Sequence, residues 1–478
     1  MIEATRPSRA IFLMSLAGLL TLLLAATTAG AAPEKEAPSG ATTITFVAKR
    51  GSEALLDLTA SAPGTDWGTA GSESAVATVT LDGEYNQDVV LFAGEQPFTY
   101  QLALGTVSAG QHTVVVAFNP DKSPAGATGV EVQNLSTQVV SAKDPAALAY
   151  QYSPILYGRD LPEIPGQFEN SYTDVPMLMY HTMSQDENGN TVIEYSVIWS
   201  NEDGGTNTPA LMARWGRSTD IEWVYRVTLD PRGNIVSEVY HGPNHATLPF
   251  TGAKESDHPL LQTSTINNNL TQVTDPALSS GYRFFMDPSE TLPEGRAREA
   301  VMDENPWSYQ IMAKELVRED KIEAKPKLST PEVSDQRNYL YIEIDKDTTY
   351  VTPPAPGTWV GTAVAVKLEG DRRWYTSNHD IPDWSIQRDI PAATTVELPP
   401  GTTTSDIEAI KVFAVPVDSN PNDATLAPSD YSIEFTDINR AFFLDENYLP
   451  GSSFIDWSGS VTLSPESPEA IVWRRPAP

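Results

Sequence analysis

Residues 220–241 read DIEWVYRVTLDPRGNIVSEVYH, and this stretch decides the class of fold. Aromatic and β-branched residues fill both of its ends, and turn-forming residues at 230–234 separate them. Runs of this kind on either side of a short turn are typical of antiparallel strands, so the pattern predicts a hairpin with strands at 220–229 and 235–241. Short strands and turns recur along most of the chain. We therefore expect a mainly β fold.

Two further β-rich regions flank the part of the chain that carries the hairpin. Short strands separated by Gly, Asp and Asn predict an N-terminal β-sandwich at residues 42–140. Residues 141–165 are rich in Ala, Pro and Gly and indicate a linker into a central β-rich domain at 152–330. Within that domain, 209–215 is predicted to continue the sheet. Strands after residue 338 predict a sandwich-like domain at 338–478, either separate from the central domain or continuous with it.

One amphipathic helix is expected, near residues 306–319. Trp307, Ile311 and Leu316 fall along one helical stripe. Asn305 and Pro306 supply an N-cap and a first-turn proline. The larger, central unit should therefore carry one conspicuous helix among strands.

The first 31 residues have the order of a secretory signal peptide. Arg6 and Arg9 precede an apolar run at 11–26, and small residues follow. A membrane anchor is the less favoured alternative, because a spanning helix needs about 20 apolar residues. No later segment is apolar enough to span a membrane, so we expect a secreted or periplasmic protein after cleavage. The chain has no cysteine, which in an exported protein of this size favours a bacterial source.

The charge balance is strongly acidic. Asp and Glu number 63 against 31 Lys and Arg, giving a formal net charge of -32. Such a surface repels nucleic acid and favours solubility or cation binding. Nucleic acid is therefore excluded as a partner, and no pattern indicates the oligomeric state.

Candidate chemistry gathers on the predicted hairpin. Alternation along the strand places Asp220, Glu222 and Arg226 on one face, with His241 at the end of the partner strand. Two carboxylates at this spacing, about 6–7 Å apart, could share a hard cation or work as an acid/base pair. We predict Asp220, Glu222 and His241 as catalytic residues. The predicted ligands of a divalent cation such as calcium or magnesium are Asp220, Glu222, His245 and His258. The alternative is that Asp-x-Glu is merely a solvated face of an acidic protein.

The same stretch also bears on zinc binding and on substrate contacts. His241 and His245 have the spacing of a helical zinc pair, but Gly242 and Pro243 between them exclude a helix and weaken the case for zinc. Tryptophans could supply flat surfaces for sugar rings. The residues predicted to contact a substrate are Arg217, Trp199, Trp215, Arg226 and Asn267.

Residues 216–222, GRSTDIE, resemble the Gly-His-Arg-His-Asp-Trp-Glu heptad of necrosis-inducing cytolysins. They are also similar to the Gly-Asp-Trp-Glu stretch of the vacuolar protein sorting-associated protein 62 family, whose His-Pro stretch matches 258–259. The resemblance spans residues 177–269 and implies a β-sandwich with few helices. The cytolysin Asp and Glu bind a divalent cation, which implies this role for Asp220 and Glu222. The first heptad histidine, also a ligand there, is Arg217 here.

Residues 81–119 resemble the jelly-roll modules appended to carbohydrate-active enzymes, which implies a glycan-binding or spacer domain. Export, acidity and tryptophan content point the same way. We therefore expect a secreted protein that interacts with polysaccharide or glycoconjugate, with a polysaccharide-degrading enzyme as its most specific form. Two alternatives stay open: a non-enzymatic extracellular surface or structural protein, and a cytolysin-like protein that acts on membranes.

Overall fold

A computed structural model describes residues 40–159, 161, 174–202, 207–279, 281–418, 427–455 and 457–476. The predicted signal peptide, 1–31, lies outside the described residues. Six sheets, built largely of antiparallel strands, dominate the described chain. The prediction of a mainly β, sandwich-like fold is confirmed.

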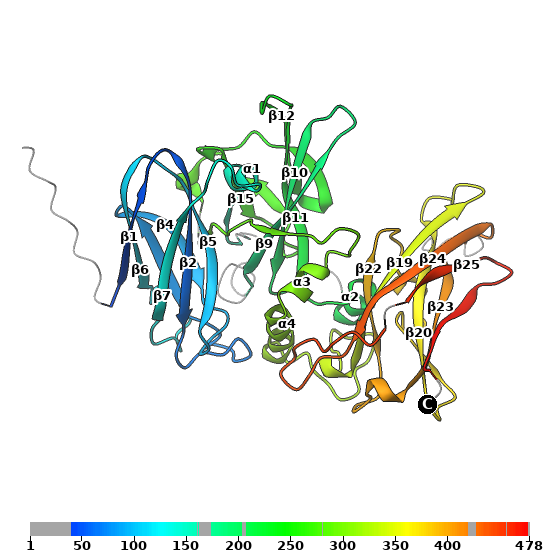
Figure 1. Ribbon diagram of the computed structural model, residues 1–478. Coiled ribbons are helices and arrows are strands. Elements are labelled where there is room, and N and C mark those ends of the chain that lie inside the picture. The colour runs from blue at the N-terminus through cyan, green and yellow to red at the C-terminus, as the bar shows by residue number, and fades with distance from the viewer. Residues whose placement is uncertain are drawn as a thin grey trace, which may run out of the picture. The chain divides into compact units, whose positions relative to one another are not determined.

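The N-terminal strands form two sheets that face each other (Figure 1). The four-stranded sheet has the order β1 (Thr42–Ala48), β6 (Gly110–Phe118), β3 (Val76–Leu81), β4 (Glu84–Val90). The three-stranded sheet has the order β5 (Phe98–Val107), β2 (Ser52–Ser61), β7 (Glu131–Val139). Leu56 and Leu58 on β2 and Val79 and Val114 on the opposite sheet are fully buried, because alternate residues of each strand point between the sheets.

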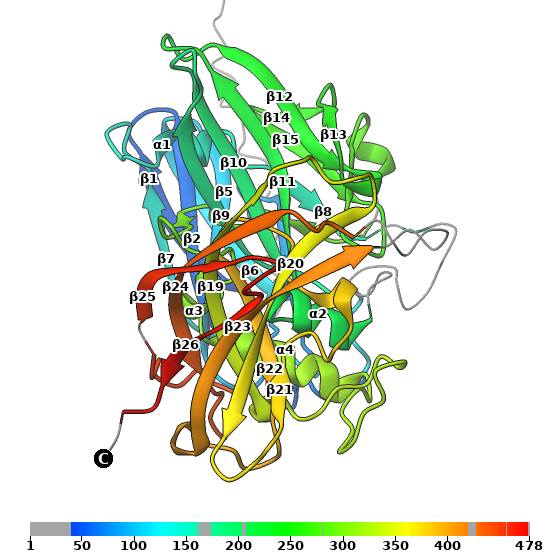
Figure 2. The ribbon, with the colours of Figure 1, turned by 90° about the vertical axis from the view of Figure 1, so that its right-hand side faces the viewer.

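A six-stranded sheet carries the hairpin, and Figure 2 shows its long strands side by side. Its order is β13 (Ala246–Pro249), β12 (Ile235–Gly242), β11 (Asp220–Leu229), β10 (Thr191–Trp199), β9 (Pro176–Gln185), β18 (Glu290–Thr291). β11 and β12 pair antiparallel, with Tyr225 opposite Tyr240. The predicted hairpin is confirmed.

A smaller sheet corrects the prediction of a linker at 141–165. Its order is β14 (Lys254–Glu255), β15 (His258–Thr263), β8 (Ile155–Tyr157), β17 (Arg283–Phe284), with β16 (Leu270–Gln272) also pairing with β15. All three residues of β8 are buried, and the short helix α1 (Ala147–Gln151) precedes it. The supposed linker thus contains a central strand, whose apolar run Ile155–Tyr157 was too short to stand out.

The helices confirm one prediction and correct two. α4 (Trp307–Arg318) buries Ile311 and Leu316, as its stripe predicted. Asn305 does not cap its start: it follows α3 (Ala300–Glu304) as the C-cap. Residues 209–215, predicted as strand, belong instead to the helix α2 (Thr208–Trp215). Pro209 suits its first turn, and Gly216 ends it in the left-handed region with a φ of 69°.

The C-terminal strands pack as two four-stranded sheets around a core of their own. One sheet has the order β22 (Ala392–Glu397), β19 (Tyr339–Tyr350), β24 (Tyr431–Phe442), β25 (Trp457–Leu463). The other has the order β21 (Trp374–Thr376), β20 (Thr358–Leu368), β23 (Ile407–Asp418), β26 (Glu469–Arg474). Short 3-10 turns complete the described elements: η1 (Pro243–His245), η2 (Pro276–Leu278), η3 (Gln336–Asn338), η4 (Pro382–Trp384) and η5 (Thr404–Asp406).

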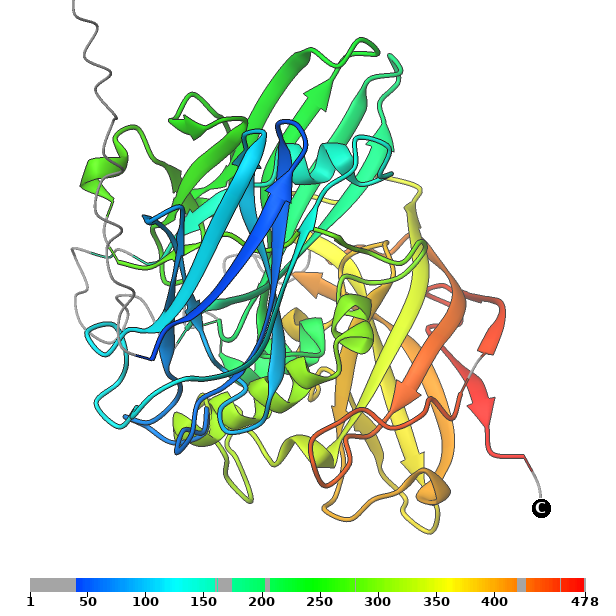
Figure 3. The same ribbon diagram turned by 60° about the vertical axis from the view of Figure 1, so that its left-hand side comes forward.

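One hydrophobic core joins the N-terminal sandwich to the central region. Trp67, fully buried in the loop after β2, donates a hydrogen bond from Nε1 to Glu315 Oε2 of α4 at 2.5 Å. Phe92 stacks on Trp307 of the same helix, with ring centroids 5.1 Å apart. Figure 3 shows α4, in yellow-green, next to the blue and cyan strands of the N-terminal sandwich. The domain boundaries expected from the sequence stay predictions. Within the described residues, no helix combines the length and hydropathy needed to cross a bilayer.

Candidate functional site

A β-bulge in β11 changes which side chains share a face with Asp220 and Glu222. Tyr225 pairs with Tyr195 of β10, but Trp223 pairs with the next residue, Ser196, so Val224 is the extra residue. A bulge breaks the alternation of faces. The prediction that Arg226 shares a face with the two carboxylates is therefore wrong.

Arg226 faces the other side of the sheet. Its Nε donates to Glu194 Oε2 at 2.8 Å, and its guanidinium lies 4.8 Å from the ring of Trp223. It thus forms a partly exposed ion pair with its cross-strand neighbour.

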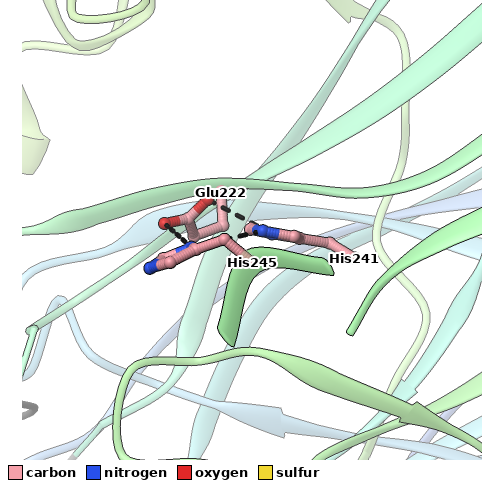
Figure 4. A group of neighbouring side chains, drawn as sticks. All are labelled: Glu222, His241 and His245. Atoms are coloured by element: carbon pink, nitrogen blue, oxygen red, sulfur yellow. Dashed lines mark hydrogen bonds and ion pairs between the residues drawn. The ribbon is translucent and has the colours of Figure 1, made fainter. Parts of the chain in front are cut away.

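The hairpin brings Glu222, His241 and His245 together (Figure 4). His241 Nδ1 lies 3.3 Å from Glu222 Oε2, and His245 Nδ1 lies 3.8 Å from Glu222 Oε1. The two rings approach with His245 Nδ1 3.3 Å from His241 Nε2. One ligand atom from each residue lies within 4.8 Å of the other two. Ligands of a tetrahedral ion with bonds of about 2.0–2.1 Å stand about 3.3 Å apart, so this spacing suits a metal ion.

The turn after β12 is what brings the second imidazole back to the first. Pro243 begins a 3-10 turn, and both Asn244 and His245 adopt positive φ, 58° and 57°. Residues other than glycine rarely adopt this left-handed backbone conformation. Two such residues in succession reverse the direction of the chain sharply. The absence of a helix, which weakened the case for zinc, does not keep His241 and His245 apart, because this turn brings the two rings together.

Burial sets the protonation of the cluster. Glu222 and His241 are largely buried, whereas the side chain of His245 is 57% exposed. Burial, with the nearby carboxylate of Asp220, raises the pKa of Glu222 to about 8. Burial, with the neighbouring His245, lowers the pKa of His241 to about 4. His241 is thus a neutral imidazole at pH 7, which is the form that binds metals, whereas Glu222 keeps its proton at pH 7 and would release it on binding a cation.

His241 also carries an unsatisfied polar atom. The residue is 2% exposed, and its Nδ1 has no hydrogen-bond partner among the described residues. Buried polar atoms without partners are rare, because each loses hydration without compensation. This atom points toward Glu222 Oε2, where a shared cation would satisfy both.

Two neighbours hold the cluster in place. Trp223 stacks on His241 with ring centroids 5.0 Å apart and planes 18° apart. The amide Nδ2 of Asn267 lies 3.3 Å from Nε2 of His245. Asn267, predicted to bind substrate, is thus beside the cluster, where it orients an imidazole.

The structure separates the remaining predicted ligands from this cluster. Asp220 is 1% exposed and accepts a hydrogen bond from Asn268 Nδ2 at 3.0 Å. Burial raises its pKa, while the guanidinium of Arg217 and this hydrogen bond act to lower it. A solvated Asp-x-Glu face is therefore contradicted. His258 lies on β15 and contacts Glu53 Oε2 and the carbonyl of Ser153, at 3.1 and 2.9 Å, so the prediction that it joins the ligand set is wrong.

Some of the predicted substrate-binding residues are buried, and others are partly exposed. Trp199 is 1% exposed and belongs to the core, so it offers no surface to a ligand. Arg217 is 2% exposed, with its Nε 3.0 Å from Glu299 Oε1. Trp215 is partly exposed and lies among guanidinium groups. Arg298 and Arg388, which contribute to that cluster, were missed because they are distant in sequence and follow no local motif.

Comparison with known proteins does not assign the chain to a family. No family model and no curated protein matches it. Among solved structures it is similar to a GH2 beta-galacturonidase from Eisenbergiella tayi bound to glycerol, at 13% identity and a TM-score of 0.14. The match covers 45% of this chain and 29% of that one. At this TM-score the similarity supports no conclusion. The resemblances to cytolysins, to the sorting-associated family and to jelly-roll modules stay predictions.

Proposed function

We propose that this protein holds a divalent transition-metal ion at Glu222, His241 and His245 and uses it on an extracellular polysaccharide or glycoconjugate. The observation that carries the proposal is the convergence of one carboxylate and two imidazoles, with a buried, unsatisfied nitrogen aimed at their centre. Export rests on the signal-peptide pattern of the first 31 residues.

The donor set points to a borderline metal rather than to calcium or magnesium. Those ions prefer oxygen ligands throughout. Imidazole nitrogen suits zinc, iron, nickel and copper, and two histidines with one glutamate form a common catalytic zinc set. The proposal therefore replaces the expected hard cation with an ion of the zinc type.

The exposure of His245 leaves one side of the site open to solvent. An ion held by Glu222, His241 and His245 would supply Lewis-acid chemistry on that open side, including the activation of water as a nucleophile. Glycosidases commonly use two carboxylates on either side of the bond. Asp220 is 1% exposed and hydrogen-bonded to Asn268, so a polysaccharide chain at the surface would not reach it as the second carboxylate. Hydrolysis of an acyl ester or amide on a sugar fits the site better than cleavage of the glycosidic bond.

Release of acetate from acetylated polysaccharides tests this function. The protein is stripped with chelator, reloaded with zinc, manganese or cobalt, and assayed for acetate and for reducing ends. His245→Asn removes one imidazole and keeps a residue that tolerates the left-handed backbone. His379→Asn is the matched control, since His379 also has positive φ (50°) and lies 3.9 Å from a glutamate, Glu397.

Metal-dependent acetate release that His245→Asn abolishes and His379→Asn retains would support the proposal. Reducing ends without acetate would instead favour polysaccharide cleavage. Retention of polysaccharide without any release would favour the non-enzymatic alternative.

A further inference from the structure

A second polar site lies where α2 meets the C-terminal sandwich. Thr395 Oγ1 donates to the carbonyl of Met212 at 2.9 Å, which ties β22 to the end of α2. A cavity of about 350 Å³ opens beside this junction. The residues lining it are Arg214, Trp215, Trp359, Ser385, Gln387, Arg388 and Asp389.

The cavity wall is rich in positive charge, although the chain as a whole is strongly acidic. The ring of Trp215 has three guanidinium groups around it, those of Arg388, Arg298 and Arg217, at 4.1, 5.2 and 5.7 Å from the ring centroid. Of these three, Arg388 lines the cavity, and Arg214 is the second arginine on the cavity wall.

Few carboxylates neutralise this group of arginines. Glu299 forms an ion pair with Arg217, behind Trp215. Asp389, the one acid on the cavity wall, lies 2.5 Å from Lys346 Nζ and is thereby paired. Among the described residues, no carboxylate lies within ion-pair distance of Arg214, Arg298 or Arg388. Arginines thus outnumber the acids around Trp215 and on the cavity wall, so the net charge of the group is positive.

The two arginines on the wall differ in what they already bind. Arg388 donates to two carbonyl groups, those of Arg214 at 2.7 Å and Ala393 at 3.2 Å, and so helps to fix α2 against β22. The side chain of Arg214 has no hydrogen-bond or ion-pair partner within the described part of the chain. Arg214 is therefore free to meet a ligand, while Arg388 is held in place by the fold.

We propose that this cavity binds a carboxylate group of a small ligand, with Arg214 and Arg388 as its cationic contacts and the tryptophans as its apolar walls. A guanidinium offers parallel N–H donors that match the two oxygens of a carboxylate. The volume lies near the lower end of small-molecule sites, roughly 300–1,000 Å³, and suits one sugar ring or a small organic acid. The proposal does not rest on the metal ion, because none of the three metal-cluster residues lines the cavity.

Saturation-transfer NMR on the whole protein tests the site at constant ionic strength. Glucuronate and malonate are the carboxylate probes, and glucose is the neutral counterpart of glucuronate. Glucuronate should bind, and Arg214→Gln should raise its Kd about tenfold or more, as expected for a lost charge-assisted hydrogen bond. Arg226→Gln removes a partly exposed arginine elsewhere, and His245→Asn removes a metal ligand. Neither should change the Kd.

Binding of malonate as well as glucuronate would support recognition of the carboxylate alone, and binding of glucuronate only would support an added contact of the ring with tryptophan. Equal binding of glucose, no binding of either carboxylate, or an unchanged Kd in Arg214→Gln would overturn the proposal. Loss of acetate release in His245→Asn with glucuronate binding intact would show that the two sites are independent.

Discussion

The buried ion pair of Arg217 with Glu299 can be tested by substitution of Arg217. The substitution is Arg217→Met, which keeps much of the apolar length of the side chain and removes the guanidinium. Arg217 and Glu299 are each 2% exposed, and the guanidinium also donates to the carbonyl of Thr219. Burial acts to raise the pKa of Glu299, but Arg217 and the neighbouring arginines outweigh it and lower that pKa.

Removal of one partner from a buried ion pair costs about 3–5 kcal/mol, because the other charge stays buried without compensation. Arg388 and Arg298 still act on Glu299, so we expect a loss near the lower bound, about 3 kcal/mol. Glu299→Gln should also destabilise the protein, since it leaves Arg217 buried without a carboxylate. The double variant, which has neither charge, should be more stable than the sum of the two losses predicts.

Equilibrium urea unfolding, followed by tryptophan fluorescence, gives the free energy of unfolding for the four proteins. A coupling of at least about 1.5 kcal/mol between the two positions would match a buried pair. A loss below about 1 kcal/mol in Arg217→Met, or strict additivity in the double variant, would refute the reasoning. It would also restore Arg217 as a candidate for ligand contact.

Three further predictions concern the fold around the sites. Trp67→Phe should lower the free energy of unfolding by about 2–4 kcal/mol in urea titrations, since it removes the hydrogen bond to buried Glu315 and leaves a gap; the half-buried Trp374→Phe should cost far less. His112, whose pKa is raised chiefly by its hydrogen bond to Asp82, should stabilise the protein below pH 6.5 and lose that effect as pH rises through its folded pKa. Because Asp82 is half exposed, the loss in His112→Gln should be only about 0.5–1 kcal/mol larger at pH 5.5 than at pH 8.5, and a pH-independent loss would contradict it. Gly216→Ala should lower the melting temperature more than Gly233→Ala, although both residues have positive φ, 69° and 84°. A Cβ added at Gly216 would lie 3.1 Å from the Cβ of Ala393, whereas one at Gly233 would meet open space, and equal shifts would show that this contact does not matter.

The features predicted correctly from the sequence are those that local pattern determines. The hairpin at 220–241 has strong strand residues on both sides of a short turn, and its two strands are neighbours in the chain. α4 has its apolar stripe within twelve residues. In both cases the information that selects the structure lies within a short window.

The incorrect predictions concern features that depend on pairing between strands rather than on the local sequence. The bulge at Val224 appears only in the pairing of β11 with β10, so alternation along β11 alone placed Arg226 on the wrong face. His258 is close to the hairpin in sequence, but β15 belongs to another sheet. The strand β2 lies within the predicted sandwich, but its Ala- and Leu-rich run favours no single period.

In two places, the sequence contains a local signal for the structure that is observed. Pro209 and Gly216 mark the beginning and end of a helix, which could have identified α2 despite its short length. Asn244 tolerates the left-handed conformation better than most residues, and it could have indicated the turn that returns His245 to His241. The cluster of Glu222, His241 and His245 could thus be predicted in part: the three residues were predicted as site residues, but not how they meet.

Calorimetric titration of chelated protein with zinc, manganese and calcium tests the central claim most directly. We predict one zinc ion per chain, a Kd at least about tenfold higher in Glu222→Gln and His245→Asn, and an unchanged Kd in His379→Asn. Calcium should not compete for the site. Absence of transition-metal binding, or equal affinity in the wild type and His245→Asn, would contradict a metal centre at Glu222, His241 and His245.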